Sequence, residues 1–206
     1  VIVISPSHAE YFPGISIYDG DAYETPLGIV EINRDMTDKL VENSKTITLG
    51  IQGHRREHAL EVQIPFLQTV LKDFKIVPVV MGDQSKVFVD ELADKISKVV
   101  DDSTLVVASS DMSHFYDSFE ANMLDSIVEK RINDFDFEQL LKDLDDHECE
   151  ACGGGPIAAM MKAASLKNIY KSFVLNRSDS GDVTGDKTEV VGYLSAVVYE
   201  WISNQN

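Results

Sequence analysis

Short apolar runs alternate with longer amphipathic segments along this chain, and this alternation limits the fold more than any other feature of the sequence. Val1–Ser5, Lys75–Met81 and Thr104–Ser109 are rich in β-branched residues, as buried strands are. Between two of these runs, Val87–Val100 repeats apolar residues at helical spacing. Such alternation favours helices layered on a sheet. We therefore expect a fold of the α/β class: a three-layer α/β/α sandwich with a mostly parallel or mixed central sheet.

The same patterns predict the other elements. Helices are expected over Asp35–Asn43, Glu57–Phe74, Val87–Val100, Phe119–Ile132, Phe135–Leu144 and Pro156–Leu166. Further strands are expected over Thr46–Leu49, Tyr170–Leu175 and Val190–Trp201, the last two forming a hairpin across the polar loop 176–189. Pro65 predicts a kink or an irregular first turn in its helix. Gly192 predicts a bulge in its strand.

The composition indicates one globular domain over residues 1–206. Hydrophobic residues make up 44% and charged residues 26%, which supplies a core and excludes a disordered chain. A net charge of −17 repels phosphate backbones, so we expect no nucleic-acid partner. Two cysteines cannot form a disulfide framework. No apolar run approaches the roughly 18–20 residues of a membrane span, and no leader pattern is visible. We expect a cytoplasmic protein that binds no membrane.

Two of the predicted strands end in small polar residues followed by a histidine. One ending is Ser5-Pro6-Ser7-His8, and the other is Ser109-Ser110-Asp111-Met112-Ser113-His114. Ligands of open α/β sheets bind beyond the carboxyl ends of the strands, so the two endings could converge on one pocket. Alternatively, their serine and aspartate residues cap the helices that follow. The presence of two such endings favours a functional site.

A third polar segment, His54–Glu61, carries two histidines and two glutamates. His54 and His58 are four residues apart, as are Glu57 and Glu61, so on a helix each pair would share a face. The order differs from the H-E-x-x-H motif of metalloproteases. The segment fits either a surface capping turn or a histidine base oriented by a carboxylate.

The fourth segment is Cys149-Glu150-Ala151-Cys152 followed by three glycines and Pro156. A structural zinc site needs four ligands, and no second C-x-x-C is present. We interpret Cys149 as incidental. Cys152 precedes a predicted helix N-terminus, whose dipole favours a thiolate. The three glycines allow close approach of a backbone or ligand, although a plain turn would explain them equally well.

Taken in order, these segments resemble the MEMO-like family. The resemblance is carried by Ser5-Pro6-Ser7-His8, Glu57–Pro65, Ser109–His114, Cys152–Ile157 and Val190-Val191-Gly192-Tyr193. The family is similar in fold to the class III extradiol dioxygenases, which are non-haem iron enzymes. The resemblance implies that His8 and Cys152 are metal ligands and that His58, Asp111 and His114 are catalytic residues around them. A mixed nitrogen and sulfur site suits iron, which we expect, or copper or zinc.

One expected residue is absent from the sequence. The family pattern has an earlier histidine, in a segment reading roughly Pro-His-Ala-Gly-Tyr, and nothing before His8 supplies it. The chain also begins with the strand pattern Val1–Ile4 rather than with methionine. We therefore expect that an N-terminal portion is missing and that the metal site is incomplete in this chain.

The resemblance implies a dioxygenase-like, metal-dependent redox enzyme acting on a small organic substrate. Two other functions stay open. The pocket could serve a binding or adaptor module without turnover, or Cys152 could be the nucleophile of a hydrolase with His114 as its base. Phosphopeptide binding is disfavoured by the net charge, because Arg55-Arg56 is the single local basic pair in this region. The resemblance also implies partner proteins of the AMMECR type and of the radical-SAM class.

Overall fold

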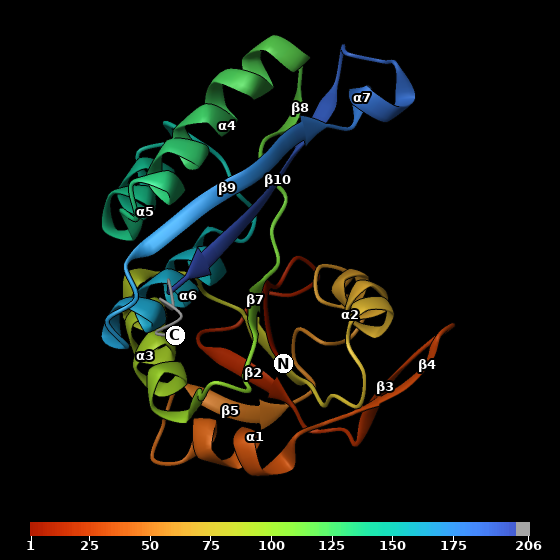
Figure 1. Ribbon diagram of the computed structural model, residues 1–206, viewed down its shortest axis with the longest axis vertical. Helices are drawn as coiled ribbons and strands as arrows, with labels where there is room; N and C mark the ends of the chain where they lie inside the picture. The colour runs from red at the N-terminus through yellow and green to blue at the C-terminus, as the bar shows by residue number, and fades with distance from the viewer. Residues whose placement is uncertain (201–206) are drawn as a thin grey trace, which may run out of the picture.

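The computed structural model describes residues 1–200, and a five-stranded mixed sheet lies at its centre (Figure 1). The strand order is β5-β2-β6-β1-β7. β1 runs parallel to both β6 and β7, and β2 runs antiparallel to β6. The elements of the chain are β1 (Ile2–Pro6), β2 (Ile15–Tyr18), β3 (Ala22–Thr25), β4 (Gly28–Glu31), α1 (Arg34–Val41), β5 (Ile47–Gly50), the 3₁₀ turn Glu61–Gln63, α2 (Ile64–Val70), β6 (Val77–Met81), α3 (Lys86–Val99), β7 (Val106–Ala108), β8 (His114–Tyr116), α4 (Ser118–Asn133), α5 (Phe137–Asp145), α6 (Gly154–Leu166), β9 (Lys171–Asp179), α7 (Gly181–Thr184) and β10 (Val190–Tyr199).

Side chains of the central strands alternate between two buried layers. Ile2 and Ile4 pack with α1, α3 and α6 on one face of the sheet, where Leu40 and Leu92 complete a core. Val3, on the opposite face, packs with Ile64 of α2 and with residues of the β3–β4 hairpin. The predicted α/β sandwich with a mixed sheet is confirmed. In the described residues, no helix is long and apolar enough to cross a membrane.

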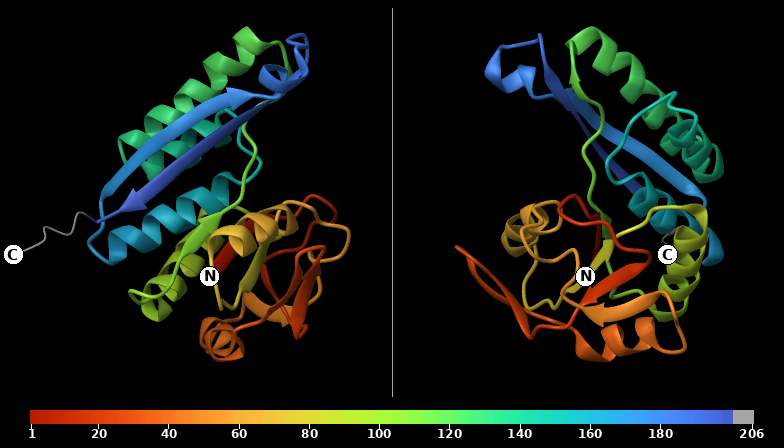
Figure 2. Two further views of the ribbon diagram at one scale, coloured as in Figure 1. Left: turned by 45° about the vertical axis from the view of Figure 1, so that its right-hand side comes forward. Right: turned by 180° about the vertical axis from the view of Figure 1, so that it is seen from behind.

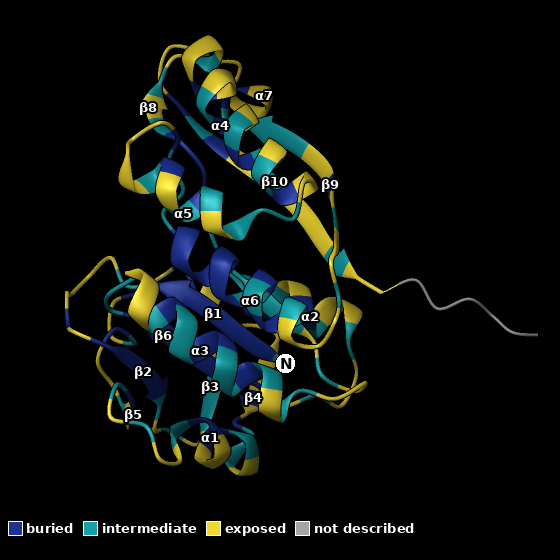
Figure 3. Ribbon diagram, turned by 90° about the vertical axis from the view of Figure 1, so that its left-hand side faces the viewer, coloured by how far each residue is buried: buried dark blue, intermediate teal, exposed yellow. Residues whose placement is uncertain are grey.

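The chain from β8 onward forms a second packed layer beside the central sheet (Figure 2). β8, β10 and β9 make a three-stranded antiparallel sheet, as the predicted hairpin requires. Helices α4 and α5 cover one face of it, and a core that includes Val128, Leu140 and Met161 joins this layer to α6. Figure 3 shows that β1 and much of α6 are buried between the two parts of the molecule. The site described below lies where these parts meet.

The predicted helix Glu57–Phe74 is wrong in extent. Residues 57–60 form turns, and a 3₁₀ turn leads into α2, which ends at Val70. The reason is Pro65: it has no backbone N–H to donate, so it fits the first turn of a new helix better than the middle of a long one. The spacing of apolar residues still predicted correctly which side chains are buried, because Leu60, Ile64 and Leu67 all lie in the core.

The hairpin strand also departs from its predicted details. Shifts of register fall on either side of Gly192, between Val190 and Val191 and between Ser195 and Ala196. At Gly192 itself, an added Cβ would lie 1.9 Å from Oδ2 of the buried Asp125. The glycine therefore admits α4 close to β10. The predicted strand end at Trp201 lies outside the described residues.

Candidate metal centre

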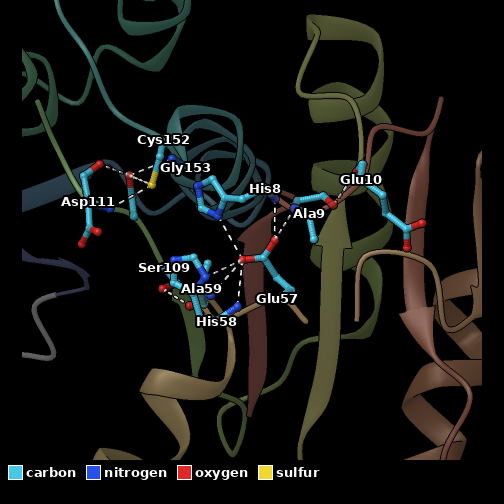
Figure 4. Close-up of polar contacts among 12 residues, drawn as sticks. His8, Ala9, Glu10, Glu57, His58, Ala59, Ser109, Asp111, Cys152 and Gly153 are labelled. Carbon is cyan, nitrogen blue, oxygen red and sulfur yellow. Dashed lines mark hydrogen bonds and ion pairs between the residues drawn. The ribbon is translucent and has the colours of Figure 1, made fainter. Parts of the chain in front are cut away.

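Three segments far apart in the sequence meet beyond the carboxyl ends of β1 and β7 (Figure 4). His8 follows β1, and Ser109 to Asp111 follow β7. The segment before α6 is attached to the end of β7, because the Cys152 N–H donates to Asp111 O over 3.0 Å and the Gly153 N–H donates to Ser110 Oγ over 2.8 Å. Convergence of the two polar strand endings is thus what the structure shows.

Glu57 lies at the centre of this arrangement. Its side chain is only 1% exposed, and its Oε1 accepts hydrogen bonds from His8 Nδ1 (2.9 Å) and from the backbone N–H groups of His58 (2.9 Å) and Ala59 (3.0 Å). Its Oε2 accepts from the backbone N–H groups of His8 and Ala9. These donors order the turn 57–60 around one carboxylate, which explains why this segment is not helical.

The environment of Glu57 keeps it ionised. Burial opposes the charged form, but the hydrogen bonds from the His8 ring and from the backbone outweigh burial and lower the pKa of Glu57 to about 2. Five donors saturate the two carboxylate oxygens, which offer about four lone-pair positions. Glu57 therefore orients His8. The sequence suggested a histidine oriented by a carboxylate within His54–Glu61, whereas the histidine that Glu57 orients lies outside that segment.

His8 and His58 stand next to each other on the solvent side of Glu57. Their rings are stacked, with centroids 5.3 Å apart, and His58 Nδ1 lies 3.7 Å from Glu57 Oε1. His8, Glu57 and His58 each offer a ligand atom, and these atoms lie within 4.8 Å of one another. The His58 side chain is 70% exposed. The structure thus contains a group that could hold a metal ion, open to solvent on one side.

Cys152 lies in the neighbouring segment but is not part of the group of ligand atoms within 4.8 Å of one another, which is His8, Glu57 and His58. Its Sγ accepts the Asp111 N–H over 3.1 Å and lies 3.9 Å from Ser110 Oγ. Burial raises the pKa of the Cys152 thiol; the N–H of Asp111 and the hydroxyl of Ser110 lower it, and the charges of Asp111 and Glu57 raise it. Figure 4 shows His8 pointing toward the segment that carries Cys152.

The remaining predicted residues, Asp111 and His114, lie beside the thiol. His114 Nε2 is 3.9 Å from Asp111 Oδ2, and both side chains are partly exposed. His114 and Cys152 line a cleft of about 490 Å³ together with His147 and Glu150. The backbone N–H of Asp111 donates a hydrogen bond to the Cys152 sulfur, while its carboxylate faces His114. The five predicted residues thus fall into two contact groups: His8 and His58 beside Glu57, and Cys152, Asp111 and His114 beyond the end of β7.

Sequence reasoning missed Gln84 and the role of Ser109, two residues that position this site. Gln84 Nε2 donates to Cys152 O and its Oε1 accepts the Gly155 N–H, both over 2.8 Å. Ser109 Oγ donates to Ala59 O over 2.5 Å and accepts from Gln63 Nε2 over 2.9 Å. Gln84 stands in no motif, whereas Ser109 begins the segment Ser109–His114 that ends a predicted strand. Cys149 is buried, which raises the pKa of its thiol to about 11.

Gly153 is a sensitive point of the site. A Cβ there would lie 2.3 Å from Ser109 O and 2.8 Å from Ser110 Cβ. We expect Gly153→Ala to lower the free energy of unfolding by about 2 kcal/mol and to displace Cys152. Denaturant titration measures the first effect. Gly50→Ala is the control, since its nearest contact would be an ordinary 3.6 Å; equal losses in both variants would contradict the expectation.

His54 does not share a face with His58, contrary to the helical spacing. Without a helix at residues 54–60, its ring turns toward β2 and β3, where Nε2 lies 3.2 Å from Ser16 O and Nδ1 lies 3.0 Å from Tyr23 Oη. A carbonyl only accepts, so Nε2 carries the proton and Nδ1 accepts from Tyr23. Burial lowers the pKa of His54 to about 4. His54 is a structural residue of this layer.

This low pKa predicts a loss of stability in acid. The unfolded chain binds a proton on His54 near pH 6.5, whereas the folded chain binds it only near pH 4, so stability falls as the pH decreases through this interval. We expect a contribution of about 3 kcal/mol from this residue. Denaturant titrations at several pH values measure it. The His54→Asn variant should lack this part of the decline, and identical profiles would exclude His54 as its cause.

Comparison with known proteins agrees with the arrangement of these segments. A family model described as Memo-like protein matches residues 1–197. A MEMO1 family protein of Methanobrevibacter smithii is 36% identical over 199 residues, which cover 95% of this chain and 71% of that protein. Similar proteins from Thermotoga petrophila (35% over 201 residues; 97% and 71% covered) and Thermoplasma volcanium (39% over 197 residues; 95% and 72% covered) carry the same family name.

Proposed function

The chain belongs to the Memo-like family, and from that premise we propose that it is a metal-dependent redox enzyme acting on a small organic molecule. His8 and Cys152 are the proposed ligands, and iron is the proposed metal. His58, Asp111 and His114 are the proposed catalytic residues. The cleft beside Cys152 and His114, with a volume of about 490 Å³, is the proposed place for the substrate.

The observation that carries this proposal is the bond between His8 and Glu57. A histidine that ligates a metal commonly donates its other ring N–H to a carboxylate, which fixes its tautomer and orientation. His8 Nδ1 has such a bond, at 2.9 Å, to a carboxylate that stays ionised. Within residues 1–200, His8 Nε2 has no hydrogen-bond partner. This nitrogen is therefore available to a metal ion with its lone pair directed away from Glu57.

The donor set supports a transition metal rather than calcium or magnesium. Imidazole nitrogen and thiolate sulfur suit iron, copper and zinc, whereas the hard cations prefer oxygen. Glu57, the one fully buried carboxylate of the group, already accepts five hydrogen bonds. A metal ion would also favour the thiolate form of Cys152, which burial disfavours in the metal-free protein. When bound, iron would supply one-electron chemistry and open positions for exchangeable ligands.

The residues around the ligands suit proton handling and substrate orientation. His58 is largely exposed and its Nδ1 faces Glu57 at 3.7 Å, which leaves Nε2 free to give or take a proton at the mouth of the site. Asp111 Oδ2 lies 3.9 Å from His114 Nε2, so the carboxylate is placed to orient the His114 ring toward a substrate. Both histidines stand on the open side of the site, where a small substrate would enter.

The experiment that tests the function is anaerobic loading with Fe(II), followed by oxygen uptake with a panel of catechol-type and other small aromatic substrates. We expect oxygen consumption that depends on iron and on one substrate class. His114→Asn and Asp111→Asn should each reduce the rate by about 10²-fold without loss of iron. Stoichiometric iron binding with no uptake on any substrate would contradict the enzyme and leave a metal-binding module.

The hydrolase reading receives less support. The described contacts of Cys152 Sγ are with Ser110 and with the Asp111 backbone, and no histidine is among them. A nucleophilic cysteine also needs a lowered pKa, whereas burial raises that of Cys152. The expected AMMECR-type and radical-SAM partner proteins stay predictions.

A further inference from the structure

The cleft proposed above for the substrate has a mixed lining. Met112, Leu141 and Leu144 supply apolar surface, whereas Asp145 and Glu150 supply two carboxylates. No lysine or arginine is among the described residues that line the cleft. Its volume of about 490 Å³ suits a small organic molecule rather than a bare ion. The walls of the cleft therefore combine negative charge with hydrocarbon surface.

Both carboxylates can accept further hydrogen bonds. Asp145 is exposed, and within residues 1–200 its carboxylate accepts no hydrogen bond and makes no ion pair. Glu150 is partly buried, and its Oε1 accepts the Tyr116 hydroxyl over 2.6 Å, while Oε2 has no partner in the described part of the chain. An ionised carboxylate offers about four acceptor positions. Each of the two can thus receive N–H donors from a ligand without losing an existing bond.

The start of α6 is the feature of the cleft that would be expected to favour an anion, because a helix N-terminus carries partial positive charge and free N–H groups. Here the N–H groups already have acceptors, which are Ser110 Oγ for Gly153, Ala151 O for Gly154 and Gln84 Oε1 for Gly155. Pro156, the next residue, has no N–H to donate. The start of α6 therefore offers no free backbone donor to a carboxylate or phosphate group.

The neighbouring helices do not reverse this polarity. α5 ends at Asp145, so the negative end of its dipole lies at the cleft. Lys142, in the last turn of α5, is exposed and does not line the cleft. Lys86, at the start of α3, is held in ion pairs with Asp90 (3.0 Å) and Glu138 (3.2 Å). The local charges thus agree in sign with the net charge of −17.

We propose that this cleft selects an organic cation, namely a small amine whose ammonium group is held by Asp145 and Glu150 and whose apolar body lies against Leu141 and Leu144. An inorganic cation is a poorer occupant, because neither carboxylate belongs to the group of ligand atoms that lie within 4.8 Å of one another. The inference names the substrate class of the proposed active site and rests on the proposed function for turnover. Binding of the amine itself needs no metal ion.

The test compares three ligands that share one phenol ring and differ in charge. Tyramine is cationic, 4-ethylphenol is neutral and 4-hydroxyphenylacetate is anionic near pH 7.5. We titrate each into the metal-free protein by calorimetry and expect tyramine to bind about fivefold or more tightly than 4-ethylphenol, with the anion weakest. Raising NaCl from about 20 mM to about 500 mM should remove most of this difference, because salt screens exposed charges.

Asp145→Asn and Glu150→Gln should each reduce the preference for tyramine over 4-ethylphenol at least twofold, since each removes one carboxylate charge from the cleft. Asp146→Asn and Glu148→Gln are the matched controls, because these acids are exposed, lie next in the same segment and do not line the cleft. Both controls change the net charge equally and should leave the preference unchanged. Amide chemical shifts that change on titration with tyramine should include those of Ala151 and Gly154, which line the cleft.

Four results would overturn the inference: equal affinities for tyramine and 4-ethylphenol, tighter binding of the anion, equal effects of the lining and control variants, or shift changes confined to another part of the surface. Failure of all three ligands to bind would overturn it as well. The proposed function fails separately. If tyramine binds as expected and the iron-loaded protein consumes no oxygen, the enzyme is excluded and the amine site stands. Oxygen uptake confined to neutral or acidic compounds would have the opposite meaning.

Discussion

The Glu57→Gln variant is expected to lose about 3 kcal/mol of stability and at least tenfold in metal affinity. The first figure follows from the pKa of Glu57, which is about 2 in the folded protein and ordinarily 4.5. The second follows from the bond to His8, because loss of an outer carboxylate partner commonly weakens metal binding by about 10- to 100-fold. Glutamine keeps the size of the side chain. Its amide NH₂ group, however, would face N–H donors that bind a carboxylate oxygen in the wild-type protein, and two donors cannot bond to each other.

The sign of the pH dependence gives an independent check on this variant. Because the folded-state pKa of Glu57 is lowered, its stabilisation is fully present above about pH 4.5 and is lost as the pH falls toward about pH 2. The wild-type protein should therefore lose its advantage over Glu57→Gln in this interval. Denaturant titrations at several pH values, together with isothermal titration of Zn(II) near neutral pH, measure both effects.

Glu61→Gln is the matched control for Glu57→Gln. Glu61 lies four residues later in the same segment and is exposed. Its substitution should change stability by less than about 0.5 kcal/mol and leave metal affinity unchanged. If Glu57→Gln destabilises the protein but keeps wild-type metal affinity, Glu57 has a purely structural role and the ligand assignment of His8 fails. If neither property changes, the carboxylate network has no energetic importance.

The sequence predicted the main strands and helices well, because the spacing of apolar residues follows the face of each element that is buried. Ile2 and Ile4 alternate with Val3 in β1, and helix α3 repeats Val89, Leu92 and Ile96 on one face, so both elements were visible without coordinates. The short strands β2, β3, β4 and β8 were not predicted. β3, β4 and β8 are at least partly exposed at most positions, so no apolar pattern distinguishes them from loops. β2 is buried, but its four residues are too few for a pattern to stand out.

The sequence predicted which residues belong to the candidate site better than it predicted the hydrogen bonds between them. Polar residues at two strand ends pointed to one edge of the sheet, and the structure brings His8, Asp111 and Cys152 to that edge. The sequence left open which carboxylate orients which histidine in His54–Glu61, and it did not connect Glu57 with His8. The histidine partner of Glu57 lies 49 residues earlier in the chain, and a contact at that separation depends on tertiary packing, which local spacing does not encode.

Alkylation of Cys152 provides the sharpest test of the ligand set, and we expect bound metal to slow it at least tenfold. In the metal-free protein the thiol should react slowly near neutral pH, because burial raises its pKa. A metal ion on Sγ would occupy the lone pair that attacks iodoacetamide. Mass spectrometry of the modified peptide separates Cys152 from the fully buried Cys149. Zn(II) is suitable for this measurement, since it has no redox chemistry of its own.

His8→Ala should abolish this protection, because the proposed site then has one ligand fewer and weaker metal binding at equal Zn(II) concentration. His147→Ala is the matched control: His147 lines the cleft beside Cys152 but lies outside the His8–Glu57–His58 group, so protection should persist in that variant. Unchanged alkylation of the wild-type protein in the presence of bound metal would exclude Cys152 as a ligand. Protection that survives His8→Ala would instead place the metal on other groups, and the bond between His8 and Glu57 would then require a structural explanation.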